Sequence, residues 1–108
     1  KTYQMDFRNP DESIRQACLD EQEGADILMV KPALAYLDVI HQLKQSTYLP
    51  VACYNVSGEY AMVKAAAQQG WISEANVVME NMYAFARAGA STIITYHARE
   101  ILEKRWLV

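Results

Sequence analysis

A lysine that directly follows four apolar residues is the first candidate for chemistry in this sequence. Lys31 closes the segment "ILMVK", and Pro32 comes next. Either the stem of Lys31 lies along apolar surface while its ammonium reaches water, or burial lowers the pKa of the amine for use as a nucleophile. A free lysine has a pKa of about 10.4, so an unperturbed amine is almost wholly charged at neutral pH. The residue alone leaves both interpretations open.

Two further polar residues occupy comparable places in the sequence. The segments "EGADILMVK" and "AGASTIITY" resemble each other, and Lys31 stands seven residues after Gly24. Tyr96 stands seven residues after Gly89 in the same way, and Ser57 follows the apolar segment "VACYNV". Parallel α/β folds bind their ligands at the carboxyl ends of strands. Three polar groups at three such ends predict one site.

Helical and strand-like segments alternate along the chain. Helices, with their caps, are expected at residues 9–24, 35–46, 58–70, 74–89 and 98–108. Strands are expected at residues 26–31, 51–56 and 91–97, the first being apolar enough to be buried on both faces. Strands that alternate with helices of this length predict βαβ units and a parallel sheet, hence an α/β fold.

Particular residues mark where the helices begin and end. Asn9 is the expected N-cap of the first helix, with Pro10 at its first position, and Ser73 is the expected cap of the fourth helix. Gly24 and Gly70 are expected to end the first and third helices.

Composition limits the classes of protein to consider. The 108 residues are 52% apolar and 21% charged, which is typical of one small packed domain. A net charge of −3 provides no basic surface for nucleic acid or an anionic membrane, and no apolar run approaches a membrane span. Cys18 and Cys53 form no CxxC pair and have no histidine nearby, so reduced thiols are expected rather than a zinc or redox site.

Four segments together resemble one enzyme family. "KTYQMD", "EGADILMVKPALAYLD", "YNVSGEYAMVKAAAQQG" and "RAGASTIITY" are similar to the C-terminal third of the porphobilinogen synthase (5-aminolevulinate dehydratase) family. The resemblance implies that residues 1–108 are a C-terminal fragment holding the last three βα units of a (β/α)8 TIM barrel, with parallel strands and an incomplete barrel. It also implies a hydro-lyase that condenses two 5-aminolevulinate molecules to porphobilinogen through a lysine Schiff base, in the biosynthesis of tetrapyrroles such as heme and chlorophyll.

The resemblance also implies roles for individual residues. Lys31 matches the lysine of the family's "MVKP" motif, which forms the Schiff base with the substrate that becomes the propionate-bearing half. Ser57 and Tyr96 match the serine of "VSGEY" and the tyrosine after the last strand, which bind that substrate's carboxylate. Tyr54 matches a tyrosine that lines the same pocket. Without the resemblance, Ser57 could be only a helix N-cap, and the two tyrosines only core aromatics.

The other implied features concern the second substrate, metals and assembly. Gln4, and a basic residue at or immediately before Lys1, match the lid that holds the second substrate. The family's second lysine and cysteine-rich metal stretch have no match here, so no cofactor is expected in this segment, although full-length members use zinc or magnesium. Gln16 replaces a glutamate ligand of an allosteric magnesium, and a neutral amide is a poor partner for that ion. Members are homo-oligomers, usually octamers, of the cytoplasm or plastid.

Two other functions remain open from the sequence. One is another barrel enzyme that forms a lysine Schiff base, such as a class I aldolase. The other is a non-catalytic α/β interaction module that keeps the family's sequence without its chemistry. Because the second lysine is missing, the isolated chain is expected to be inactive.

Overall fold

The computed structural model describes residues 10–107, and helices and strands alternate in it as the sequence predicts. The elements are α1 (Pro10–Gln22), β1 (Leu28–Val30), η1 (Leu34–Tyr36), α2 (Leu37–Ser46), β2 (Val51–Asn55), α3 (Ser57–Gln68), α4 (Glu74–Ala88), β3 (Thr92–Thr95) and α5 (Ala98–Glu103). The strands are shorter than expected, by one to three residues each. None of the described helices combines the length and the apolar character that crossing a bilayer requires.

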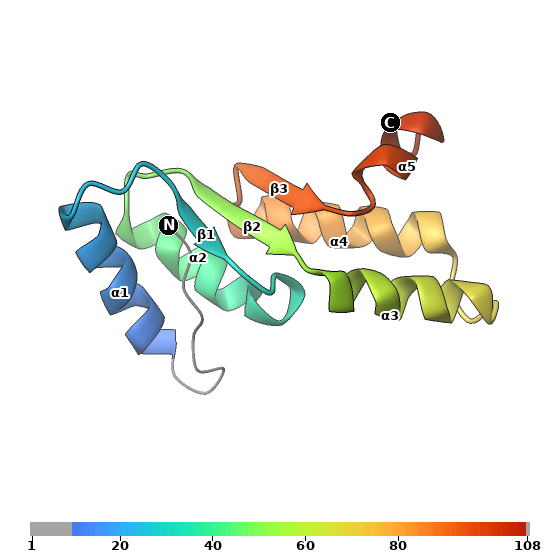
Figure 1. The fold of residues 1–108 in the computed structure, drawn as a ribbon, viewed down its shortest axis with the longest axis horizontal. Coiled ribbons are helices and arrows are strands. Elements are labelled where there is room, and N and C mark those ends of the chain that lie inside the picture. Colours follow the sequence, from blue (N-terminus) through green and yellow to red (C-terminus); the bar gives the residue numbers. More distant parts are fainter. Residues whose placement is uncertain (1–9, 108) are drawn as a thin grey trace.

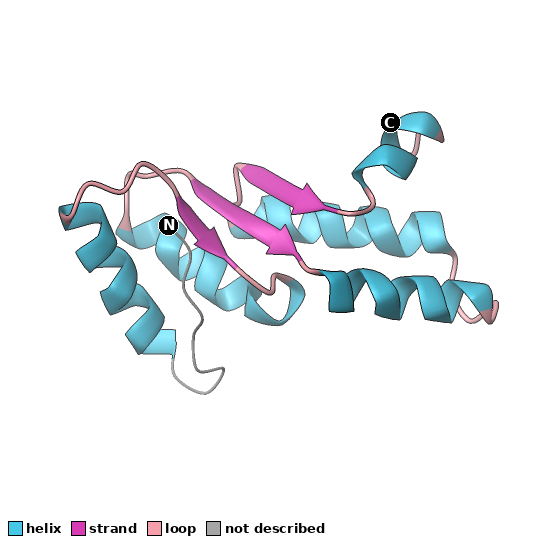
Figure 2. Cartoon of the chain, viewed as in Figure 1, coloured by secondary structure: helices cyan, strands magenta, loops and turns pink. Residues whose placement is uncertain are grey.

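The three strands form one parallel sheet in the order β1-β2-β3, which confirms the predicted α/β class (Figure 2). Val30 at the end of β1 lies opposite Cys53 of β2, and Asn55 at the end of β2 lies opposite Thr95 of β3. The sheet is unclosed. All three strands therefore end at the same edge, which we call the carboxyl edge.

Helices cover one face of this sheet (Figure 1). α2 and α4 pack on the strands and on each other, α1 packs on α2, and α3 lies beside α4. The core between the layers is formed by fully buried apolar side chains, among them Leu28, Val30, Ile40, Leu43, Val51, Val78 and Phe85. On the other face, side chains such as Tyr54 and Ile94 remain partly exposed. In β1 itself Leu28 and Val30 are fully buried and Met29, on the other face, is only partly buried, so within the described part of the chain this strand is not fully buried on both faces as predicted.

Two glycines end helices and turn the chain into the next strand in the same way. Gly24 and Gly89 have φ values of 95° and 129°, in the region that favours glycine. After each glycine an alanine N–H donates across the turn, from Ala25 to Asp20 and from Ala90 to Phe85. This is the Schellman arrangement, and it explains why the two similar segments of the sequence both begin with Gly-Ala.

Helix starts agree with the sequence in one case and differ in another. The Ser73 hydroxyl accepts a hydrogen bond from the N–H of Asn76, at 3.4 Å, so Ser73 caps α4 as predicted. Ser57, in contrast, is the first residue within α3, and the N-cap is Val56. The N–H of Val56 donates to the Glu59 carboxylate, which is the backward half of a capping box. Reading Ser57 as the N-cap is therefore wrong. The expected N-cap Asn9 lies outside the described residues.

The two cysteines are expected to differ strongly in reactivity. Burial, with a further contribution from the charge of Glu59, raises the pKa of the Cys53 thiol to about 12, whereas Cys18 is exposed on α1. Because the thiolate is the nucleophile, iodoacetamide at pH 8 should alkylate Cys18 and leave Cys53 unmodified until urea is added. Peptide mass spectrometry of the protein and of a Cys18→Ser control measures both sites. Equal labelling of Cys18 and Cys53 without urea would contradict the described core.

Candidate functional site

The predicted site residues lie at the carboxyl edge of the sheet. Lys31 directly follows β1 and is half-buried, Ser57 opens α3 just beyond β2, and Tyr96 directly follows β3 and is 54% exposed. The central strand therefore carries the hydroxyl, and the flanking strands carry the amine and the phenol. Among the described residues, no hydrogen bond joins Lys31 to Ser57 or Tyr96. The three side chains therefore share an edge of the sheet without being joined to one another.

Tyr54 and Tyr96 are in direct contact. Their hydroxyl oxygens are 2.9 Å apart, and the ring centroids are separated by 6.2 Å. Tyr54 belongs to β2 and Tyr96 directly follows β3; because Cys53 belongs to the core, strand alternation puts Tyr54 on the opposite face of the sheet. The hydrogen bond to Tyr96 raises the pKa of Tyr54, which keeps the Tyr54 phenol a neutral hydrogen-bonding group near neutral pH. The pair can bind a carboxylate without adding a charge of its own.

Strand alternation indicates which face Lys31 shares. Met29 lies opposite Ala52, one residue before the pair of Val30 and Cys53. Successive side chains of a strand point to opposite faces, so the position after Val30 belongs to the face of Met29 rather than to the helix-covered core. Tyr54 follows Cys53 to the same face. The amine and the two phenols are therefore expected on one side of the sheet.

Sequence reasoning missed the aromatic partners on α3. The ring centroid of Tyr60 lies 5.6 Å from that of Tyr96 and 4.5 Å from that of His97. His97 is 2% exposed, and its Nδ1 atom has no hydrogen-bond partner among the described residues. Tyr60 belongs to the "VSGEY" segment, three residues after Ser57, so a one-turn spacing from the N-terminus of a helix was the available signal.

A buried carboxylate lies between the strand ends, and it too was missed. Glu59 is 9% exposed and accepts hydrogen bonds from Leu34 N–H at 2.7 Å, from Ala33 N–H at 3.2 Å and from the Asn55 side-chain amide at 2.8 Å. Together with the Val56 N–H, these donors join the turn after β1 to the first turn of α3. The spacing of Glu59 from the end of the preceding strand predicts a capping interaction, but not the donors across the sheet.

Asn55 extends this network to the third strand. Its Oδ1 atom accepts from the Thr95 hydroxyl at 2.7 Å, while its Nδ2 donates to Glu59. The Thr95 hydroxyl in turn accepts from the N–H of His97 at 3.2 Å. Buried amides are stable only when both of their ends are satisfied, and here both are. One polar network thus connects all three strand ends.

A second charged cluster lies between α3, α4 and α5. The Lys64 ammonium is 2.6 Å from a carboxylate oxygen of Glu74 and 2.6 Å from one of Glu100. Hydrogen bonds to Glu100 and Glu74 raise the pKa of Lys64. The hydrogen bond from Lys64 in turn lowers the pKa of Glu100. The two carboxylates and a His97 nitrogen lie within 4.8 Å of one another, a spacing that suits a metal ion. The lysine already neutralises the carboxylates, so the cluster is a salt-bridge network rather than a cation site.

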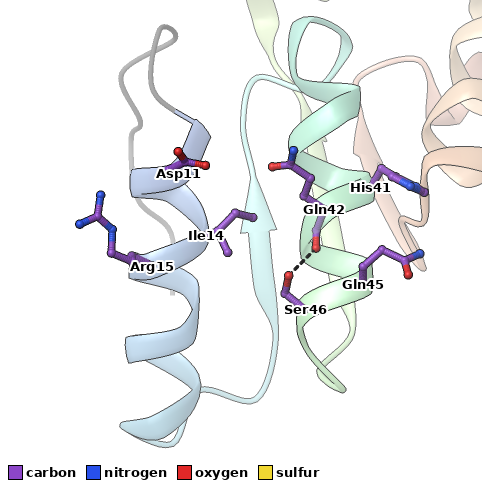
Figure 3. Close-up of a pocket in the computed structure, with 7 residues that line it drawn as sticks. All are labelled: Asp11, Ile14, Arg15, His41, Gln42, Gln45 and Ser46. Atoms are coloured by element: carbon purple, nitrogen blue, oxygen red, sulfur yellow. Dashed lines mark hydrogen bonds between the residues drawn. The ribbon is translucent and has the colours of Figure 1, made fainter.

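A groove between α1 and α2 lies away from the carboxyl edge (Figure 3). It encloses about 580 Å³ and is lined by Asp11, Ile14, Arg15, His41, Gln42, Gln45 and Ser46. The Ser46 hydroxyl donates to the backbone oxygen of Gln42, at 2.8 Å, and His41 is exposed. The residues that line this groove do not place a nucleophile next to a base, so we assign the candidate active site to the carboxyl edge.

The structure says less about the remaining predicted residues. Gln4 and Lys1 lie outside the described residues. Gln16 is exposed on α1, where its side-chain amide donates to the Asp20 carboxylate at 3.1 Å.

Comparisons with known proteins agree with the resemblance. A family model described as "Delta-aminolevulinic acid dehydratase" matches residues 1–104. The chain is 58% identical to the delta-aminolevulinic acid dehydratase of Synechococcus elongatus over 107 residues, which are 99% of this chain and 32% of that protein. It is 53% identical to the protein of the same name from Bacillus subtilis. The chain thus spans about a third of the length of these relatives.

A solved structure is similar as well. The crystal structure of delta-aminolevulinic acid dehydratase (porphobilinogen synthase) from Toxoplasma gondii, in complex with the reaction product porphobilinogen, superimposes with a TM-score of 0.91. Identity is 51%, and the match covers 94% of this chain and 29% of that one. The expected fold, three βα units of a larger barrel, is in agreement with this match.

Buried His97 should make stability depend on pH. Burial, followed by the nearby charge of Lys64, lowers the pKa of His97 below 6.5, against the opposing effect of Glu100 and Glu74. The folded state therefore keeps His97 neutral at pH values at which the unfolded chain protonates it. Stability is complete above about pH 6.5 and is lost as the pH falls below that value.

Urea unfolding midpoints between pH 5 and 7.5 measure this dependence. The midpoint should fall with pH in that window, and a His97→Gln variant should flatten the fall. An exposed-histidine control, His41→Gln, should retain the wild-type slope. Equal slopes for wild type and His97→Gln would show that His97 is protonated in the folded state.

Proposed function

The chain belongs to the delta-aminolevulinic acid dehydratase family, and we propose that it supplies the Schiff-base half of an active site that condenses two 5-aminolevulinate molecules into porphobilinogen. The observation that carries this proposal is the common location of Lys31, Ser57 and Tyr96 at the carboxyl edge. The similar Toxoplasma gondii structure holds porphobilinogen, which identifies the product of that relative.

Lys31 is the proposed nucleophile. Its unprotonated amine attacks the ketone carbon of one 5-aminolevulinate molecule, and the carbonyl oxygen takes up a proton to give a carbinolamine. A further proton taken up by the carbinolamine hydroxyl lets that oxygen leave as water, and the nitrogen lone pair forms the C=N bond of an iminium ion joined to Lys31. The iminium withdraws electrons from the neighbouring carbon, which prepares it to form a bond to the second substrate.

Ser57 and the tyrosine pair are proposed to hold the carboxylate of the same substrate. Ser57 opens α3, so unpaired N–H groups of the first turn and the positive end of the helix are available beside its hydroxyl. Tyr96 and Tyr54 add neutral phenol donors from the neighbouring strand ends. Donors of this kind bind an anion and leave the charge state of the amine undisturbed.

Other parts of the active site are proposed by family likeness alone. Gln4 and a basic residue at or near Lys1 would hold the second substrate as part of a lid. The second lysine and any zinc or magnesium would come from outside this chain, with no cofactor bound by it. We further propose a homo-octamer that does not bind nucleic acid or membranes. The cytoplasm is the proposed location, or a plastid, since the relative from Chlamydomonas reinhardtii is named chloroplastic.

Reductive trapping tests the role of Lys31. Borohydride added to the full-length protein with 5-aminolevulinate should reduce the imine and leave substrate mass on Lys31, located by peptide mass spectrometry. A Lys31→Met variant should lose the adduct and activity together, whereas Lys44→Met, at an exposed lysine of α2, should keep both. An adduct on another lysine, with Lys31 unmodified, would favour a different Schiff-base enzyme, and no adduct at all would favour an interaction module.

The isolated 108-residue chain should form no porphobilinogen. In the proposed reaction a second lysine assists the second substrate, and no lysine of this chain matches it. A colorimetric pyrrole assay, run beside the full-length protein at equal molar concentration, measures this directly. Pyrrole formation by the isolated chain above that of its Lys31→Met variant would show that the second lysine is dispensable.

A further inference from the structure

We propose that Glu59 is a positioning residue for Lys31: its buried carboxylate holds the turn after β1 against the first turn of α3. This inference rests on the proposed function. Leu34 and Ala33, whose N–H groups donate to Glu59 at 2.7 and 3.2 Å, stand only three and two residues after Lys31. The backbone that carries the amine is therefore tied to a side chain of a different element.

The Glu59 carboxylate also contacts the part of the site that is proposed to bind the carboxylate of the substrate. Val56, immediately before Ser57, donates its N–H to Glu59 at 3.2 Å. Glu59 therefore accepts hydrogen bonds both from the backbone that follows Lys31, the proposed nucleophile, and from the backbone that precedes Ser57, a proposed donor to the substrate carboxylate. The distance between amine and hydroxyl must match the distance between the ketone and carboxylate of one substrate molecule, and this tie sets it.

Asn55 gives the tie a second anchor. Its amide donates to Glu59 at 2.8 Å and accepts from Thr95, the residue before Tyr96. Asn55 is 3% exposed and Glu59 is 9% exposed, so water does not replace these partners easily. In these contacts only uncharged donors compensate the charge of the Glu59 carboxylate. Lys31 therefore does not have to form a salt bridge with Glu59.

The geometry predicts a kinetic effect that exceeds the effect on stability. Leu34 and Ala33 donate to Oε2 of Glu59, whereas Asn55 and Val56 donate to Oε1. In Glu59→Gln one of these oxygens becomes an NH2 group, so the donors on one side of the tie lose their acceptor and the turn after β1 is no longer held to α3 from both sides. Misplacement of a reacting group by about 1 Å costs roughly 10²-fold in rate. We therefore expect imine formation at Lys31 to slow by roughly 10- to 100-fold at saturating substrate.

The experiment follows borohydride trapping at Lys31 over time in the full-length protein, at a temperature at which circular dichroism reports every variant folded. Glu74→Gln is the matched control, because it removes a partly buried carboxylate that pairs with Lys64 and lies near His97 but accepts no hydrogen bond from Ala33, Leu34, Asn55 or Val56. That control should trap Lys31 within about twofold of the wild-type rate. Hydrogen exchange at the amides of residues 33 and 34 should quicken in Glu59→Gln alone.

Asn55→Ala covers the case in which Glu59→Gln does not fold. It removes one donor from Glu59 and leaves the three backbone donors, so trapping should slow by several-fold. Trapping at the wild-type rate by either folded variant would overturn the positioning role. If the wild type itself forms no adduct at Lys31, the proposed function is wrong, and so is the role of Glu59 in catalysis. Hydrogen exchange at residues 33 and 34 would still report whether Glu59 holds the turn after β1.

Discussion

Parallel pairing of the three strands is the constraint on which the site depends. Parallel strands in one sheet begin at one edge and end at the other, so every residue that follows a strand reaches the same place. β2 and β3 end level, with Asn55 opposite Thr95, and β1 ends two residues earlier, with Val30 opposite Cys53. Residues 31, 57 and 96 are distant in sequence and reach the same edge of the sheet for this reason. Helix lengths and glycine turns serve to bring each strand back to the same starting edge.

The second requirement is that polar groups at this edge be satisfied away from water. An uncompensated buried carboxylate costs several kcal/mol, and Glu59 avoids that cost through backbone and amide donors rather than through a cation. Lys64 of α3 does not supply this compensation, since it is paired with Glu74 and Glu100. An edge stabilised by neutral donors can hold a reactive amine without quenching it in a salt bridge.

Much of the fold could be predicted from local signals. Glycine after a helical segment, a serine before one and short apolar runs between them set the order of elements, and the repeat of Gly-Ala turns at Gly24 and Gly89 even predicted equivalent strand ends. The residues of the site were predicted as candidates for the same reason. The buried network was not, because Glu59, Asn55 and Thr95 acquire their partners only across the sheet, and a polar residue in sequence reads as exposed until its donors are known.

The error about the first strand has an instructive cause. An apolar run indicates that a strand is covered, but it does not say which part of a protein covers it. Within the described residues, helices protect only one face, and the face that carries Tyr54 and Ile94 is partly open. Parallel sheets are normally covered on both faces, and the relatives are about three times as long as this chain. An amine reacts as a nucleophile only when it is unprotonated, and exclusion of water favours the unprotonated form. If the proposed function holds, this chain supplies the amine, hydroxyl and phenol at one edge, and whatever covers the open face would exclude water around the amine.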